Sequence, residues 1–407
     1  MIRPVRGLIV VVGVAWLVAC SGTEGPPEPR QEPLVGGPYP ALLVAQAQFH
    51  EETGEDGKPK VVPGAAKLQI VRQTESGWKS VVLEDPDSNV FHKAVAYDAG
   101  ILTIGGTQAM LKYWSFADGK WSQTIHWNPT FGGRFDRLRD MESGDVDGDG
   151  KPELVIATHD QGVIAVIHPD EGWRVEQVDR EAGTFVHEIE VGDFDGDGVD
   201  EFFATPSAPN KPDQEQPGEV RMYRHSEDGY TRTVVAQPHD THAKEILVAD
   251  VDQDGHPELY VAWEGAISSG SLARPVSIEQ FVWRGDRFEG APVGQIEDRQ
   301  LRAMAAGDVN GDGKIDLVAG AMRSGLWLFE QGEGGWSRSL IDGNSSGYEH
   351  PVDLADLDGD GQLEIYVGSE DQQELRQYRF VDGQFQKRVI GELTKGDITW
   401  NITDGRF

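Results

Sequence analysis

Four acidic side chains are spaced at short, regular intervals in the segment GDVDGDGKPELVIAT, residues 144–158, which ends in an apolar run. They are Asp145, Asp147, Asp149 and Glu153. Carboxylates this close repel one another by several kcal/mol unless a counter-charge is bound. Ca²⁺ takes about six to eight oxygen ligands, which loops supply from alternate side chains, a backbone carbonyl and a more distant acid. Because the Lys151 carbonyl and Glu153 complete such a set, the segment predicts a calcium-binding loop.

The same pattern occurs five times, and its first acid recurs after 48, 57, 58 and 48 residues. One acidic cluster is usually a solvated loop, whereas five copies in one frame predict five structural Ca²⁺ ions. A glycine follows the third ligand because the chain must turn there with positive φ. Asn310 replaces a carboxylate in the fourth copy, so we expect weaker binding there. With the carbonyl donor in fourth place, the predicted ligands are Asp145, Asp147, Asp149, Lys151 and Glu153; Asp193, Asp195, Asp197, Val199 and Glu201; Asp250, Asp252, Asp254, His256 and Glu258; Asp308, Asn310, Asp312, Lys314 and Asp316; Asp356, Asp358, Asp360, Gln362 and Glu364.

Apolar runs at fixed places in each period indicate the elements that hold these loops. An alternating run precedes each loop, and a β-rich run follows it: ELVIAT, EFFAT, ELYVAW, DLVAGA and EIYVGS. Two further short runs complete each period. Four short strands between Gly and Asp turns are typical of a propeller blade. No stretch has a sustained helical period, so the predicted fold is all-β.

The loops and their flanks resemble the integrin-type FG-GAP repeats and the bacterial VCBS-type calcium-loop repeats. The resemblance is carried by the DxDGDG-like loops, each preceded by SGD, VGD, VAD, AGD or LAD, and it covers about residues 90–390. It implies a β-propeller with the metal loop on the turn between the first and second strands of a blade. It implies little about the ligand, because this fold carries many functions.

The blade count depends on segments that lack the loop. Residues 92–127 follow the strand rhythm with Asp98 in the first-acid frame, so we expect a blade without calcium there. Upstream, ALLVAQAQ, KLQIVRQ and WKSVVLE predict three strands, and DITWNITDGRF predicts one strand at the C-terminus. If this last strand becomes the innermost strand of the first blade, the ring closes without an open edge. Residues 39–407 then form a seven-bladed propeller, with six or eight blades as alternatives.

The N-terminal segment predicts export and a lipid anchor. Residues 1–19 combine a basic start with a short apolar core, and LVAC at 17–20 resembles a bacterial lipobox. Cys20, the predicted lipidation site, is the only cysteine, so no intramolecular disulfide is possible. Residues 20–38 are rich in Pro, Gly and Glu, as expected of an extended tether. Ser21 favours the outer membrane of a Gram-negative bacterium, and an uncleaved anchor is the alternative.

The formal net charge of −33 limits the possible partners. Nucleic acid and anionic membrane surfaces are poor partners for such a protein. Five Ca²⁺ ions would offset only part of this charge. The remaining excess favours a soluble monomer in a calcium-replete exterior.

A ring of nitrogen-bearing side chains is the main candidate for ligand binding. Six residues before the first acid of each frame, at the expected start of each innermost strand, the chain carries a basic or titratable residue. These residues are His92, Arg139, His187, Lys244, Arg302 and His350. They suggest an anion site at the channel mouth. Nearby acids such as Asp140, Glu188 and Glu245 offer the alternative that salt bridges close the ring and leave no ligand site.

Long turns between second and third strands mark the face opposite the calcium loops, at residues 49–64, 205–218 and 263–276. The sequence contains no nucleophile elbow, no zinc-binding His-Glu pair on a helix and no phosphate loop followed by a helix, so no catalytic residue is predicted. We therefore favour a non-catalytic module that binds a protein or an anionic glycan. The alternative is a polysaccharide lyase, in which Arg302 would neutralise a uronate and a histidine or arginine would move the proton.

Overall fold

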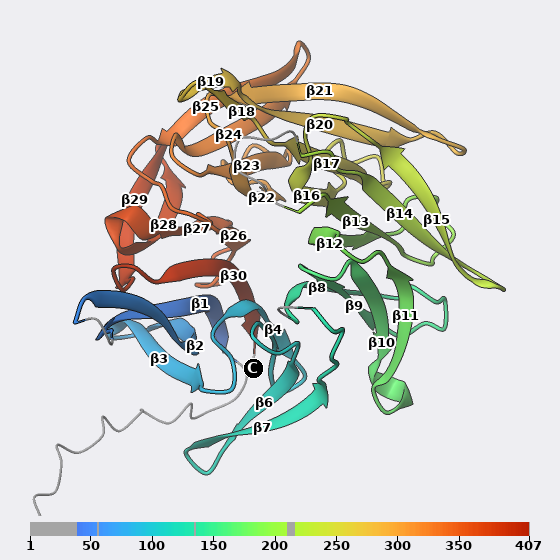
Figure 1. Cartoon of the computed structure of the whole chain (residues 1–407). Helices are drawn as coiled ribbons and strands as arrows, with labels where there is room; N and C mark the ends of the chain where they lie inside the picture. The colour runs from blue at the N-terminus through green and yellow to red at the C-terminus, as the bar shows by residue number, and fades with distance from the viewer. Residues whose placement is uncertain (1–38, 55–56, 134–135, 210–215, 407) are drawn as a thin grey trace, which may run out of the picture. The chain divides into compact units, whose positions relative to one another are not determined.

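The computed structural model describes residues 39–54, 57–133, 136–209 and 216–406. They form a seven-bladed β-propeller in which each blade is a four-stranded antiparallel sheet (Figure 1). The predicted fold class and blade count are therefore confirmed. Cys20 and the predicted leader and tether lie outside the described residues. Within those residues, no helix is long and apolar enough to cross a membrane.

In every blade the strands follow one another from the channel outward. Blade 1 contains β30 (Ile398–Arg406), β1 (Pro40–Thr53), β2 (Pro59–Thr74) and β3 (Gly77–Asp85). Blade 2 contains β4 (Phe91–Tyr97), β5 (Gly100–Gly105), β6 (Leu111–Ala117) and β7 (Lys120–Trp127). Blade 3 contains β8 (Leu138–Gly144), β9 (Glu153–Thr158), β10 (Val163–His168) and β11 (Arg174–Arg180). Blade 4 contains β12 (Phe185–Gly192), β13 (Glu201–Ser207), β14 (Val220–Ser226) and β15 (Gly229–Ala236).

The remaining blades follow the same order. Blade 5 contains β16 (Ala243–Ala249), β17 (Glu258–Trp263), β20 (Val276–Trp283) and β21 (Phe288–Ile296). Blade 6 contains β22 (Leu301–Gly307), β23 (Asp316–Ala321), β24 (Gly325–Gly332) and β25 (Gly335–Asp342). Blade 7 contains β26 (Val352–Ala355), β27 (Glu364–Ser369), β28 (Glu374–Val381) and β29 (Gln384–Glu392). Outside the blade sheets lie the hairpin β18 (Ala266–Ser268) and β19 (Ser271–Arg274) and the 3-10 turns η1 (Pro169–Glu171) and η2 (Glu370–Gln372).

The C-terminal strand closes the ring as predicted. Strand β30 pairs antiparallel with β1, and the buried Gln46 side chain donates a 3.1 Å hydrogen bond to Thr399 Oγ1 between them. Leu42 and Ile402, from opposite ends of the chain, pack in one cluster with Leu357 of blade 7. Joining both ends of the chain in one sheet leaves no blade at an open edge of the ring.

The hydrophobic core is divided among seven clusters, one at each interface between neighbouring blades. Alternate residues of each strand face one interface or the other, so strands covered on both faces have long apolar runs. All six residues of β9, for example, are buried. Each blade is therefore held mainly by its two neighbours.

Three turns between second and third strands are longer than the others, as the sequence indicated. Strands β1 and β2 extend as a long hairpin, and the turn in blade 5 contains the β18–β19 hairpin. The third runs from Ala208 to Glu219 in blade 4, partly outside the described residues. In blade 2 the turn from β4 to β5 consists only of Asp98 and Ala99, which agrees with the prediction of a blade without a metal loop.

Candidate metal loops and central channel

The five acidic loops connect the innermost strand to the second strand in blades 3 to 7. In the first loop, Asp145 Oδ1 accepts a 2.9 Å hydrogen bond from the Gly148 amide, and Asp145 Oδ2 accepts one of 2.9 Å from the Gly150 amide. Gly150 has a φ of +84°, a conformation that a Cβ would strain. The first acids of the other loops make the same bond to the glycine after the third ligand. The chain therefore forms the loop geometry itself.

An apolar residue anchors each loop in the core between blades. It follows the first acid and is at most 6% exposed. Each packs in the cluster shared with the next blade around the ring. These residues are Val146, Phe194, Val251, Val309 and Leu357. The loops are thus coupled to the packing of neighbouring blades, so a metal bound there would stabilise the ring as well as the turn.

The last acid of each loop begins the second strand and is buried. These closing acids, with their exposed fractions, are Glu153 at 3%, Glu201 at 2%, Glu258 at 1%, Asp316 at 2% and Glu364 at 0%. Desolvation raises the pKa of Glu153, Glu258 and Asp316 to about 7, and neighbouring acids add to the rise. A buried carboxylate of this kind needs a proton, a cationic side chain or a metal ion.

The loops fit a hard divalent cation. The carboxylate oxygens of Asp250, Asp252, Asp254 and Glu258 converge within 4.8 Å of one another in blade 5, and the alternating acids converge equally in blades 3, 4 and 7. Oxygen donors of this kind and number suit Ca²⁺. A metal ion in the loop would be held by these acids and would supply the charge that the buried closing acid lacks.

The residue opposite the closing acid is an arginine in two loops and a different residue in each of the other three. The sequence analysis did not identify this position. Extending the pairing of the second and third strands by one residue places it directly across from the acid. In blades 3 to 7 it is His168, Arg224, Val282, Glu330 and Arg379. Because the connecting turns differ in length, this position has no constant spacing from the loop.

Arginines at this position bring a positive charge into two loops. Arg224 Nε lies 2.7 Å from Glu201 Oε1, and its Nη2 lies 2.9 Å from Asp195 Oδ2. Arg379 contacts Asp358 at 2.7 Å and Glu364 at 3.3 Å. Blade 5 has an uncharged valine there. The negative charge of the loops in blades 4 and 7 is thus partly neutralised by these arginines, whereas that of the loop in blade 5 is not.

Glu330 adds a carboxylate to the loop that contains Asn310. Asn310 Nδ2 donates a 3.4 Å hydrogen bond to Glu330 Oε1, and Glu330 adds to the raised pKa of Asp316, whose main cause is burial. The carboxylate missing at Asn310 is therefore replaced from strand β24. Weaker calcium binding in this loop stays a prediction.

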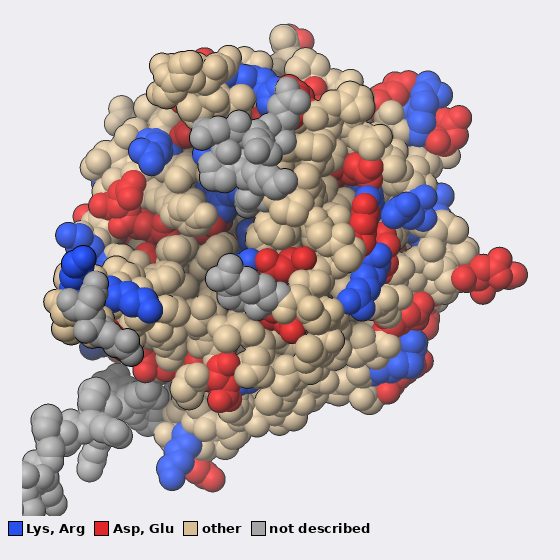
Figure 2. Space-filling model, in the orientation of Figure 1, with Lys and Arg blue, Asp and Glu red and all other residues tan. Residues whose placement is uncertain are grey.

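A cavity of about 450 Å³ lies in the central channel and is lined by the innermost strands of all seven blades. Of the six predicted ring residues, His92, Arg139 and Arg302 line it, whereas His187, Lys244 and His350 are not among its lining residues. On the face shown in Figure 2, acidic and basic side chains are interspersed around the central hollow.

Salt bridges occupy the cationic residues of the channel. Arg139 pairs with Glu188 at 3.3 Å, and Arg302 pairs with Glu349. This geometry supports the alternative of a salt-bridged ring. It also disfavours the lyase, because Arg302 is not free to neutralise a substrate carboxylate.

The three histidines of the ring are buried and held by neutral groups. His92 Nδ1 lies 2.6 Å from the Leu138 carbonyl, and His187 Nε2 lies 3.0 Å from Ser207 Oγ. His350 lies 2.7 Å from both Ser345 Oγ and the Ala321 carbonyl. Burial lowers the pKa of His350 to about 4 and the pKa values of His92 and His187 well below the usual range. At neutral pH these three residues add no positive charge.

Sequence reasoning missed Lys93, which follows His92 and lies inside the channel. Its Nζ lies 3.0 Å from Asp140 Oδ1 and also contacts Glu142. Burial opposes its charge, but these two acids raise its pKa well above the usual value. The sequence did contain a signal. Lys93 directly follows the ring residue of its blade, as Asp140, Glu188 and Glu245 do in theirs, and it is a cation at a position where those three residues are acids.

Carboxylates outnumber cations around the cavity. The acidic lining residues are Asp140, Glu142, Glu188, Glu190, Glu245, Glu349, Asp353 and Asp404, and the cationic ones are Lys93, Arg139 and Arg302. Burial raises the pKa of Glu245 to about 8 and that of Asp353 to about 7. Part of the acidic excess is thus offset by protons, and this composition disfavours an anion in the cavity.

Two adjoining hollows lie among the long turns, on the face opposite the loops. One of about 340 Å³ is lined by residues of blade 4 that include Pro209 and Pro217. The other, of about 420 Å³, is lined by residues that include Trp263 and Arg274. Gln237 and Pro238 line both hollows, so these form one continuous surface.

Comparison with known proteins supports the repeat assignment. Two segments of this chain match the family model described as FG-GAP-like repeat. They cover residues 145–204 and 308–367, and each begins at the first acid of one loop and includes the whole next loop. No curated protein matches the chain. Among solved structures, one titled "putative 6-phosphogluconolactonase" from Bacteroides fragilis is similar at 10% identity and a TM-score of 0.53, and the match covers 92% of this chain and 100% of that chain. This likeness concerns the fold alone.

Proposed function

We propose that this chain is an exported, lipid-anchored, calcium-binding propeller that binds a protein or glycan without catalysing a reaction. The observation that carries the calcium assignment is the burial of all five closing acids, each at the end of a loop whose other oxygens are already arranged. Calcium would be structural, because each loop is anchored in the core between two blades. The FG-GAP-like repeats support this proposal.

Calcium is tested by unfolding the full chain in excess chelator and in saturating calcium. A ligand present at about 100 times its dissociation constant stabilises the folded state by about 2.7 kcal/mol per site. We therefore expect a large fall in melting temperature on chelation, restored by added calcium. Coincident melting curves in the two buffers would show that the calcium assignment is wrong.

The two adjoining hollows are the proposed binding surface. They lie between long turns, which in compact repeats commonly carry function. Arg274 offers a guanidinium whose side chain is 36% exposed and which contacts the carboxylate of Asp240, itself 52% exposed; Trp263 and Phe281, each 7% exposed, form part of the wall. These groups suit an extended polar ligand such as a glycan strand or a peptide segment.

An array of glycans and peptides tests this surface. We expect the Arg274→Ala variant to lose about tenfold or more in affinity for any ligand that the wild-type chain binds. Arg287→Ala is the matched control, because Arg287 is exposed on the turn between β20 and β21 and lines neither hollow. An equal loss of affinity in both variants, or no loss in Arg274→Ala, would show that the two hollows are not the binding surface.

The membrane anchor rests on the sequence around Cys20. We expect metabolic labelling with a fatty acid to mark the wild-type chain and to fail in Cys20→Ser. A labelled serine variant would contradict the lipidation proposal without affecting the calcium or ligand proposals.

A further inference from the structure

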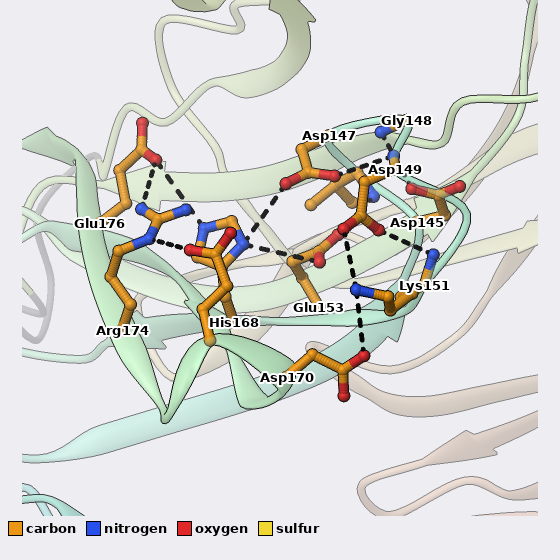
Figure 3. Close-up of polar contacts among 12 residues, drawn as sticks. Asp145, Asp147, Gly148, Asp149, Lys151, Glu153, His168, Asp170, Arg174 and Glu176 are labelled. Atoms are coloured by element: carbon orange, nitrogen blue, oxygen red, sulfur yellow. Dashed lines mark hydrogen bonds and ion pairs between the residues drawn. The ribbon is translucent and has the colours of Figure 1, made fainter.

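The loop of blade 3 contains a buried histidine where the other loops have none. His168 is the last residue of β10 and lies opposite the closing acid Glu153. Its Nδ1 lies 3.4 Å from Asp147 Oδ2 and 3.5 Å from Glu153 Oε1 (Figure 3). These three side chains bring their ligand atoms within 4.8 Å of one another.

The imidazole is enclosed and directed into this acidic group. His168 is 3% exposed, and its Nδ1 faces Asp147 and Glu153, whereas its Nε2, on the other side of the ring, has no hydrogen-bond partner among the described residues. A buried polar atom without a partner is costly and calls for a specific reason. The observation is independent of the acidic spacing, because it concerns the third strand of the blade.

We propose that blade 3 holds a transition-metal ion of the zinc class, bound by His168 Nδ1, Asp147 and Glu153. The proposal rests on the proposed function only in that the same loop supplies the two carboxylates. An imidazole nitrogen with carboxylate oxygens suits Zn²⁺ and similar ions, whereas Ca²⁺ takes oxygen ligands. The other four loops, which have no histidine at this position, remain calcium loops.

The separations fit such an ion. Zinc lies about 2.0–2.2 Å from nitrogen and carboxylate ligands, so adjacent ligand atoms of a tetrahedral site are about 3.4 Å apart. The distances of 3.4 and 3.5 Å from His168 Nδ1 to the two carboxylate oxygens agree with this spacing. Three protein ligands would leave one position for water, an arrangement known from zinc sites that keep an open coordination position.

A carboxylate also lies behind the imidazole. Glu176 Oε2, on the outer strand β11, is 3.8 Å from His168 Nε2. Metal-binding histidines commonly donate their second ring N–H to a carboxylate, which fixes the ring and strengthens the ligand. A small rotation of Glu176 would complete that bond. Arg174 holds the same carboxylate at 3.2 Å and can keep it in place.

The other two acids of the loop do not face the histidine. Asp145 accepts hydrogen bonds from the amides of Gly148 and Gly150, as in the turns of the other loops, and Asp149 lies 3.4 Å from the ammonium group of Lys151. Lys151 also pairs with Asp170 at 3.2 Å. Asp147 and Glu153 are therefore the two carboxylates that face the histidine, as Figure 3 shows.

The test is a titration of the full chain with Zn²⁺, and with Co²⁺ as a spectroscopic probe, in saturating calcium. We expect one tight ion per chain, with a Co²⁺ absorption spectrum typical of nitrogen and oxygen ligands. His168→Val, which copies the valine of blade 5, should weaken this ion at least about tenfold. His239→Val is the matched control, since His239 is exposed on the opposite face.

Calcium stoichiometry, measured in the same samples, shows whether the variant is folded. If His168→Val does not fold, His168→Gln is measured in its place. Equal zinc affinity in wild-type and variant chains, or no bound zinc in the wild type, would overturn the proposal. A chain that binds one zinc ion through His168 but no calcium would support it while refuting the proposed calcium function.

Discussion

The metal loops and the central channel both gather carboxylates, but they balance that charge differently. In the loops, the side chains come from one short segment, and in blade 5 no cationic side chain stands opposite the closing acid. In the channel, Lys93, Arg139 and Arg302 come from three blades and pair with acids of neighbouring strands. The loop of blade 5 therefore has no internal counter-charge opposite its closing acid, whereas the channel acids meet their cations only when neighbouring blades pack.

The largest effect is expected from Lys93→Met, which tests the internal balance of the channel. It leaves Asp140 and Glu142 without their cation, and removing one partner of a buried pair costs about 3–5 kcal/mol. Denaturant unfolding measures the loss. Lys387→Met is the control, because the exposed Lys387–Asp342 pair contributes less than about 1 kcal/mol. Equal stability of the two variants would refute an internally balanced channel.

Substituting the closing acids should show that the loops differ in how much stability they gain from calcium. Glu258→Gln in blade 5 is expected to lose one calcium ion and about 2–3 kcal/mol of calcium-dependent stability. Glu364→Gln should lose less, because Arg379 already neutralises part of that loop. Calorimetric stoichiometry and melting with and without calcium check both. A larger loss at Glu364 would contradict the role given to the arginine.

Raising the pH should weaken the channel through Glu245. Burial raises its folded-state pKa to about 8 from a usual value near 4.5, so its protonated form is favoured in the folded state. This contribution is complete below about pH 4.5 and is lost as the pH rises through 8. Glu245→Gln should be more stable than the wild type at pH 9 by on the order of 1–2 kcal/mol. If the stability of the two chains changed with pH in the same way, the prediction would be wrong.

The smallest effect is expected from Arg379→Gln, which should make blade 7 resemble blade 5. Without the guanidinium, the loop is less stable in chelator by about 1 kcal/mol or less, since the Arg379 side chain is 34% exposed. In saturating calcium the difference should shrink, because the ion replaces the lost charge. A variant that melts identically to the wild type in both buffers would show that Arg379 does not neutralise the loop.

Much of the fold could be predicted because its signals are local and repeated. The five loops, the strands around them, the blade without a loop and the closing C-terminal strand were all visible as patterns in the chain. The partners of the ring residues were only partly visible. Arg302 pairs with Glu349, the residue before His350, and no nearby motif indicated this contact.

The sequence by itself determined the geometry of the acidic loops, since their oxygen-bearing side chains lie within nine residues and the turn is fixed by glycine and by hydrogen bonds to the first acid. Only the tertiary structure decided which charge each loop meets and how the channel is balanced. His168, Arg224, Glu330 and Arg379 reach their loops through strand pairing across turns of unequal length. The channel pairs join residues 47 to 49 positions apart, which meet only when neighbouring blades pack.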